Sequence, residues 1–283
     1  MLDTPANELS VVTAARVEAM SYNDLIGLVR ETNRPPGGIK VLEAIASRLS
    51  LGPDKHLLEI GCATGWTSIE LGLLTGCRIT AIDLNPASVA EARRRADRAG
   101  LTNVKFEVAD ASDLPLESES VDVVFCGNVT SLVSDRDRVM REYVRVLKPG
   151  GKLVAIPMYY VDEPPMEVVD RVRKAIQVNI PVHFEKDACA PFFELGLDVH
   201  DDIRFRFDEQ PVQRVADFCE EVLARPHLDA LPPDARASLD HVYREQMELF
   251  RVNLALMGFS VLILRKALPD QEAELFSASV APN

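Results

Sequence analysis

Hydrophobic residues between about residue 55 and residue 157 follow two patterns that alternate along the chain. Short continuous apolar runs predict strands that are buried on both faces, and the stretches between them carry apolar residues at helical spacing. We expect strands at residues 57–60, 78–83, 104–108, 121–126 and 152–157. We also expect Asn85 and Ser134 to cap the helices that follow the second and the fourth of these strands. Strict alternation of strand and helix is typical of a parallel α/β sheet that is covered on both faces.

The flanking parts of the chain are richer in helical patterns. Residues 1–54 predict three short helices before the first strand, and we interpret them as an N-terminal helical cap. A breaker at residues 33–38, which contains Pro-Pro-Gly-Gly, separates the second of these helices from the third. Residues 55–283 form the main domain in this interpretation, with a sixth strand at 199–207 and a seventh at 259–264. A helical insertion at about 211–256 separates those two strands, and we expect the cap and the insertion to roof the ligand crevice.

A turn of small residues follows the first predicted strand, from Gly61 to Gly65. Such a turn lets a nucleotide-like ligand approach the backbone at the carboxyl end of the strand. The G-x-G-x-x-G fingerprint of dinucleotide-binding proteins has its last glycine at the position where this chain has Trp66. Glu59 precedes the turn, and its negative charge disfavours a pyrophosphate and favours a cationic ligand. The turn therefore suits a nucleoside with an amino-acid tail better than NAD or FAD.

Polar residues also end the next three predicted strands. Asp83 ends the second strand, where a carboxylate can accept both ribose hydroxyls. Asp110 ends the third strand, where it can accept from an adenine amino group, and Asn128 follows the fourth. The carboxyl ends of parallel strands meet at one edge of a sheet, so these side chains are expected to surround a single ligand.

Composition limits the classes of partner. A net charge of −13 argues against a nucleic-acid substrate, which requires a basic footprint. The odd number of cysteines, five, indicates buried free thiols rather than a disulfide or zinc framework, and we expect no metal site. No apolar run reaches membrane length and no signal peptide pattern is present, so we expect a cytoplasmic protein without membrane contact. A homodimer is left open.

With this set of motifs the chain resembles the class I S-adenosylmethionine-dependent methyltransferases. The resemblance covers about residues 55–157, with its motifs in family order and at family spacing. The matching segments are Leu58-Glu59-Ile60-Gly61-Cys62-Ala63-Thr64-Gly65, Ala81-Ile82-Asp83-Leu84-Asn85, Ala109-Asp110-Ala111, Val121-Asp122-Val123-Val124-Phe125 and Val146-Leu147-Lys148-Pro149-Gly150-Gly151. One departure is Ala63, which stands where the family usually has glycine.

The resemblance implies a Rossmann-like sheet of seven mostly parallel strands, with the last strand antiparallel beside the fifth. It implies S-adenosylmethionine as cofactor, its methionine moiety on the Gly61–Gly65 turn, its ribose on Asp83 and its adenine near Asp110. The expected cofactor residues are Tyr22, Glu59, Gly61, Cys62, Ala63, Thr64, Gly65, Asp83, Leu84, Asp110, Ala111 and Asn128.

The expected reaction is methyl transfer to the oxygen, nitrogen or carbon of a small organic acceptor, which we expect to be a metabolite or natural product. His183 and His241 are candidate general bases. Tyr159 directly follows the fifth strand, so we expect it to face the crevice and orient the acceptor. One alternative is a peptide or protein methyltransferase, and another is a catalytically silent protein that only binds S-adenosylmethionine. A nicotinamide dehydrogenase ranks below both.

Overall fold

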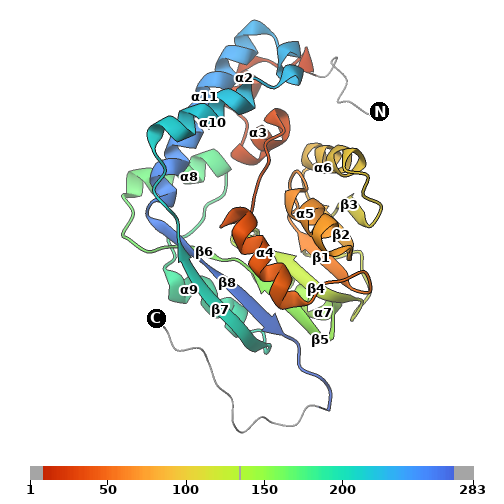
Figure 1. Ribbon diagram of the computed structural model, residues 1–283. Coiled ribbons are helices and arrows are strands. Elements are labelled where there is room, and N and C mark those ends of the chain that lie inside the picture. The colour runs from red at the N-terminus through yellow and green to blue at the C-terminus, as the bar shows by residue number, and fades with distance from the viewer. Residues whose placement is uncertain (1–8, 134, 271–283) are drawn as a thin grey trace.

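An eight-stranded mixed sheet lies at the centre of the structure (Figure 1). The computed structural model describes residues 9–133 and 135–270. The strands are β1 (His56–Ile60), β2 (Arg78–Asp83), β3 (Val104–Val108), β4 (Val121–Cys126), β5 (Leu147–Ala155), β6 (Met158–Tyr160), β7 (Asp198–Arg206) and β8 (Met257–Arg265). Their order is β3-β2-β1-β4-β5-β8-β6, and β7 pairs with β8.

The first five strands pair in parallel, and β8 runs antiparallel to its three neighbours β5, β6 and β7. The predicted mostly parallel sheet and its antiparallel last strand are confirmed. Strand β6 was not predicted. It forms because the chain resumes an extended course after Pro157, where Tyr159 pairs with Gly258 on the same edge of β8 that β5 uses. A three-residue strand of this kind leaves no periodic signal in the sequence.

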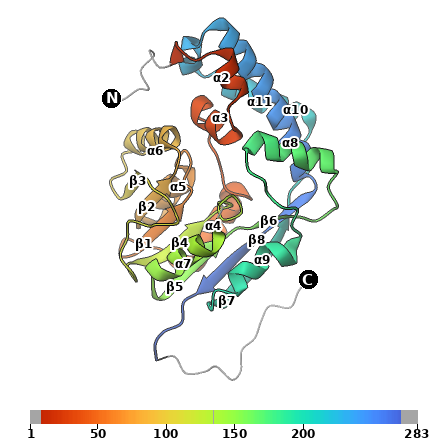
Figure 2. The same cartoon turned by 180° about the vertical axis from the view of Figure 1, so that it is seen from behind.

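Helices cover both faces of the sheet. Helices α4 (Gly38–Leu49), α5 (Trp66–Thr75) and α6 (Pro86–Arg98) pack on one face, which is turned to the viewer in Figure 1. Helices α7 (Arg136–Val146) and α9 (Glu185–Phe193) pack on the other face, as Figure 2 shows. The strands are apolar on both sides because each side contributes to one of these two cores.

Local signals fix where the helices begin. Asn85 caps α6 by accepting from the backbone N–H groups of Ala87 (2.9 Å) and Ser88 (3.2 Å), as predicted. The expected cap of α7, Ser134, lies outside the described residues. The Asp135 side chain caps that helix by accepting from the Arg138 N–H at 3.0 Å.

The remaining helices form a separate layer, which we call the roof: α2 (Ala14–Glu18), α3 (Tyr22–Val29), α8 (Met166–Ile176), α10 (Val212–Leu223), the 3-10 helix η1 (Pro226–Ala230) and α11 (Pro233–Leu254). Helices α2, α3, α10 and α11 share one apolar core. Helix α4 packs on the sheet instead, so residues 1–54 contribute to both layers. The division into a cap at 1–54 and a main domain at 55–283 stays a prediction. None of the helices in the described ranges has the length and apolarity needed to cross a membrane.

Candidate functional site

The turn between β1 and α5 is held in a conformation that favours small residues. Gly61 has φ +72°, Ala63 φ +44° and Gly65 φ +85°. The N–H groups of Gly61 and Cys62 both donate to the Ile82 carbonyl, at 2.8 and 2.9 Å. A Cβ atom on Gly65 would come within 2.7 Å of the Ala92 Cβ. The turn is therefore fixed between β2 and α6, and its left-handed residues explain the need for glycine at this point.

Asp83 ends β2 and connects it to the turn. One carboxylate oxygen accepts from the Ala63 N–H at 2.8 Å, and the other accepts from the Asn85 N–H at 2.8 Å. Burial raises the pKa of Asp83, and these backbone hydrogen bonds oppose the rise. A carboxylate offers about four acceptor positions, so Asp83 can accept further hydrogen bonds. Asp83 therefore shapes the turn and also retains acceptor capacity for a pair of hydroxyl groups.

The edge of the site beyond Asp83 is open. Leu84 is 67% exposed although it is a large apolar residue. The ends of β2 and β3 are joined by the hydrogen bond from the Ala109 N–H to the Asp83 carbonyl, at 3.2 Å. Asp110 is exposed there, and hydrogen bonds from Ser112 lower its pKa, so its carboxylate is ionised. An apolar side chain beside an ionised acceptor suits an aromatic ring that carries an amino group.

Glu59 lies beneath the turn rather than at its surface. The side chain is 4% exposed, and its carboxylate accepts from the Ser68 hydroxyl. Burial raises the pKa of Glu59 to about 7, against hydrogen bonds from Ser68 and Thr67 that lower it. From the sequence we expected the Glu59 side chain to place a negative charge next to the ligand. In the structure this side chain is instead a buried acid with a pKa near neutral pH.

The other expected cofactor residues have different surroundings. Cys62 and Ala111 are buried in the two cores of the sheet, so only their backbones can reach a ligand. Asn128 accepts from the Ser131 hydroxyl at 3.0 Å through its side-chain oxygen. Thr64 is fully buried and donates to the Glu31 carbonyl at 2.6 Å. Thr64 thus binds the N-terminal segment to the turn.

Glu31 was not recognised from the sequence. Its carboxylate is buried and accepts from the hydroxyl of Tyr243 at 2.6 Å, while Tyr22 approaches its other oxygen at 3.5 Å. Burial raises the pKa of Glu31, and the hydrogen bond from Tyr243 opposes this. Through its side chain Glu31 contacts the roof, and through its carbonyl it contacts Thr64 of the turn. No local sequence pattern predicts the contact between Glu31 and Tyr243, because the two residues are 212 positions apart.

The segment between α3 and α4, residues 30–37, passes beside the ends of the strands. Pro35 comes within 4.0 Å of the position that a Cβ on Gly127 would occupy, directly after β4. Gly37, at the start of α4, faces Val41 and Phe259. The Pro-Pro-Gly-Gly stretch that looked like a helix breaker therefore brings the N-terminal part of the chain to the carboxyl edge of the sheet.

The three catalytic candidates lie in different environments. His183 is half-buried in the loop before α9, and burial together with the nearby Arg136 cation lowers its pKa. His241 is 72% exposed on α11 and pairs with Glu245 at 3.6 Å. Tyr159 is buried within β6, and its hydroxyl lies 3.2 Å from that of Ser260. The expectation that Tyr159 faces the crevice is wrong, because strand pairing turns its ring into the core between the sheet and α9.

These residues fit S-adenosylmethionine. The positive-φ turn would accommodate the methionine moiety, Asp83 would accept the ribose hydroxyls, and the exposed Leu84 with Asp110 would border the adenine. The turn leaves no space for a side chain at Gly61, because a Cβ atom there would come within 2.0 Å of the Val129 side chain. Among the described residues, no group of three or more His, Cys, Asp or Glu side chains is arranged to hold a metal ion.

Comparison with known proteins agrees with this geometry. Residues 58–155 match the family described as a methyltransferase domain. The 27-O-demethylrifamycin SV methyltransferase of Amycolatopsis mediterranei (strain S699) is 33% identical over 162 residues, 56% of this chain and 60% of that protein. The chain spans less than two thirds of the length of the first curated relatives that it matches.

Two solved structures share the fold at low sequence identity. The [4+2]-cyclase SpnF has a TM-score of 0.65 at 21% identity, covering 91% of this chain and 98% of that one. A geranyl diphosphate methyltransferase in complex with S-adenosylmethionine has a TM-score of 0.56 at 18% identity, covering 81% and 85%. The turn, the strand-end acids and the match over residues 58–155 together support a class I S-adenosylmethionine-dependent methyltransferase domain within this chain.

Proposed function

We propose that this protein transfers the methyl group of S-adenosylmethionine to a small organic acceptor held between the strand ends and the roof. The observation that carries the proposal is the Asp83 carboxylate. It accepts from Ala63 at the centre of the turn and from Asn85, and it keeps lone pairs for two ribose hydroxyls. The site is thus already organised for a nucleoside that ends in an amino acid.

The cofactor would supply an activated methyl carbon on a positively charged sulfur. The protein's part is to hold that carbon in line with the acceptor and to exclude water. The roof and the 30–37 segment can exclude water because Glu31 joins them to the turn through Tyr243 and Thr64. Holding the two reacting atoms in line lowers the barrier, because the entropy cost of bringing them together is met on binding.

A small acceptor is supported by the charge and by the relatives. A net charge of −13 disfavours a nucleic acid. The Amycolatopsis relative is described as a methyltransferase of 27-O-demethylrifamycin SV, a small molecule. We extend this to a metabolite or natural product as acceptor and to a cytoplasmic site of action.

Where the acceptor is a hydroxyl or a protonated amine, we propose His183 as the general base. Its lowered pKa keeps the imidazole neutral at pH 7, so it can take a proton. His241 is less suited, because it faces solvent on the roof and pairs with Glu245. His183→Asn should lower kcat for such an acceptor by about 100-fold or more. The matched variant His241→Asn should retain the wild-type kcat.

Calorimetric titration with S-adenosylmethionine, S-adenosylhomocysteine and NAD tests the cofactor site. Binding of both adenosyl ligands without binding of NAD supports the proposal, and binding of NAD alone would contradict it. A fold shared with a [4+2]-cyclase means that binding does not establish methyl transfer. Small acceptors and peptides should therefore be screened with methyl-labelled cofactor. Label found only in peptides would favour the protein-directed alternative, and cofactor binding without label transfer would favour a catalytically silent protein.

A further inference from the structure

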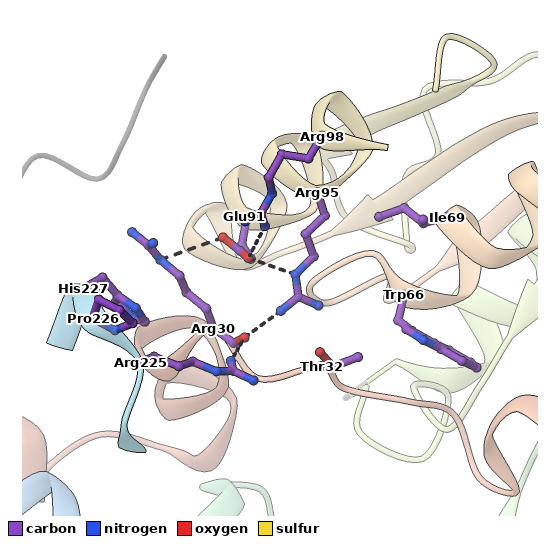
Figure 3. A pocket seen from close by; sticks show the side chains of 10 residues that line it. All are labelled: Arg30, Thr32, Trp66, Ile69, Glu91, Arg95, Arg98, Arg225, Pro226 and His227. Carbon is purple, nitrogen blue, oxygen red and sulfur yellow. Dashed lines mark hydrogen bonds and ion pairs between the residues drawn. The ribbon is translucent and has the colours of Figure 1, made fainter. Parts of the chain in front are cut away.

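A cavity of about 560 Å³ lies between the end of α3, helix α6 and the turn from α10 into η1 (Figure 3). It lies beside α5 and α6, whereas the cofactor residues Asp83 and Asp110 are absent from its walls. Four arginines line it, namely Arg30, Arg95, Arg98 and Arg225. They come from three segments that are distant in sequence, so the tertiary fold alone gathers them.

The cavity carries an excess of positive charge. Glu91 is the one carboxylate among the described residues of its wall. That carboxylate lies 2.8 Å from Arg95, 3.5 Å from Arg98 and 3.8 Å from Arg30. Figure 3 shows these side chains converging on it. Behind the wall, the buried Glu31 carboxylate also acts electrostatically on Arg225 and Arg95. Two carboxylates still face four guanidinium groups, and this excess of positive charge occurs in a protein whose net charge is −13.

Backbone carbonyl groups also hold two of these arginines in place. Arg95 donates to the Arg30 carbonyl at 2.6 Å, and Arg225 donates to the Val29 carbonyl at 2.8 Å, both at the end of α3. Carbonyl groups accept hydrogen bonds but carry no net charge. Burial lowers the pKa of Arg95, Glu91 raises it, and the neighbouring cations Arg225 and Arg98 lower it by smaller amounts. A bound anion would relieve this repulsion.

We propose that this cavity is a second binding site, which takes the phosphate group of a small organic molecule. Planar guanidinium forks match the oxygens of a phosphate in pairs, and several of them around one pocket are typical of phosphate recognition. The volume exceeds what a bare phosphate needs and falls within the range of small-molecule sites.

The wall opposite Arg225 and His227 suits the organic part of such a ligand. Trp66 and Ile69 contribute apolar surface there, and Thr32 adds a hydroxyl (Figure 3). Trp66 directly follows Gly65 of the cofactor turn, so the two sites share one element. Binding in the cavity uses none of the proposed cofactor contacts, and it can be tested without S-adenosylmethionine.

The test is calorimetric titration of the full chain with phenyl phosphate, inorganic phosphate and benzoate. Phenyl phosphate should bind more tightly than the other two, and more weakly as salt is raised. Arg98→Gln should weaken it about fivefold, because the Arg98 side chain is 70% exposed and makes one ion pair in the wall. Arg30→Gln should weaken it about tenfold or more, because the Arg30 side chain is only 17% exposed. Arg171→Gln, on the exposed side of α8, is the matched control and should have no effect.

Thermal unfolding of each variant separates loss of the site from loss of the fold. Weakened binding in folded Arg98→Gln and Arg30→Gln supports the site. Absence of phenyl phosphate binding, or equal weakening in Arg171→Gln, would overturn it. Inorganic phosphate binding as tightly as phenyl phosphate would refute the organic ligand, and benzoate binding as tightly would refute phosphate recognition. None of these results depends on methyl transfer.

Discussion

Replacing Glu59 by glutamine should remove a large part of the pH dependence of folding stability. Glu59 is buried beneath the cofactor turn, and burial raises its pKa to about 7 from a usual value of 4.5. The folded protein therefore holds a proton on Glu59 at pH values where the unfolded chain has lost it. The contribution of Glu59 to the free energy of unfolding is fully present below about pH 4.5 and is lost as the pH rises through about 7.

The size of the effect follows from the two pKa values. At about 1.4 kcal/mol per pKa unit, the raised pKa of Glu59 corresponds to roughly 3 kcal/mol of the free energy of unfolding. The isoelectric point is about 4.9, so measurements are best made above about pH 5.5, where solubility is higher. Roughly 2 kcal/mol of the loss falls between about pH 5.5 and 8.5.

Urea unfolding of the wild type and Glu59→Gln at several pH values measures this difference. The free energy of unfolding of the wild type should fall by roughly 2 kcal/mol relative to the variant across that range. Comparing the two proteins cancels the contribution of other buried acids such as Glu31. Glu43→Gln, at an exposed position on α4, is the control and should follow the wild type. A constant difference between wild type and Glu59→Gln would refute the buried, protonated Glu59.

Three further variants test the site and its support. Asp83→Ala should weaken S-adenosylmethionine binding by roughly 1–3 kcal/mol, and Asp83→Asn by less, because an amide keeps one acceptor; equal calorimetric affinities for wild type and Asp83→Ala would exclude the ribose role. Tyr243→Phe should lower the free energy of unfolding by about 1–3 kcal/mol in urea, since it removes a hydrogen bond to a buried carboxylate. Tyr160→Phe, which loses a bond to a neutral amide, should cost less, and the reverse order would contradict the assignment. Gly65→Ala should lower stability by about 2 kcal/mol or more, because its Cβ would collide with a neighbouring side chain. Gly100→Ala has a similar φ and open space, so thermal unfolding should show a smaller loss, and equal losses would disprove the packing argument.

The sequence predicted the sheet well because its signals are local. Continuous apolar runs predicted most strands within one or two residues, and Asn85 with Pro86 predicted the start of α6. Strand β5 is the exception, because it begins at Leu147, five residues before the predicted start at residue 152. The acids at the strand ends could be placed because parallel strands bring their carboxyl ends to one edge. Strand β6 was missed because three residues after Pro157 carry no periodicity.

The catalytic candidates were less predictable, because residue type does not reveal orientation. His183 and His241 look alike in sequence, yet one is half-buried and the other is 72% exposed. Tyr159 looked like a crevice residue, and pairing with β8 turned it into the core.

The sequence by itself determined the class of the sheet, the small-residue turn and the acids that follow the strands, because each depends on neighbours within a few positions. Tertiary structure alone decided which distant groups meet. It buried Glu31 against Tyr243 and raised the pKa of Glu59 by desolvation. It also gathered four arginines and Glu91 around one cavity in an acidic protein. Burial, desolvation and long-range charge depend on how the layers pack, and no local pattern of residues records that packing.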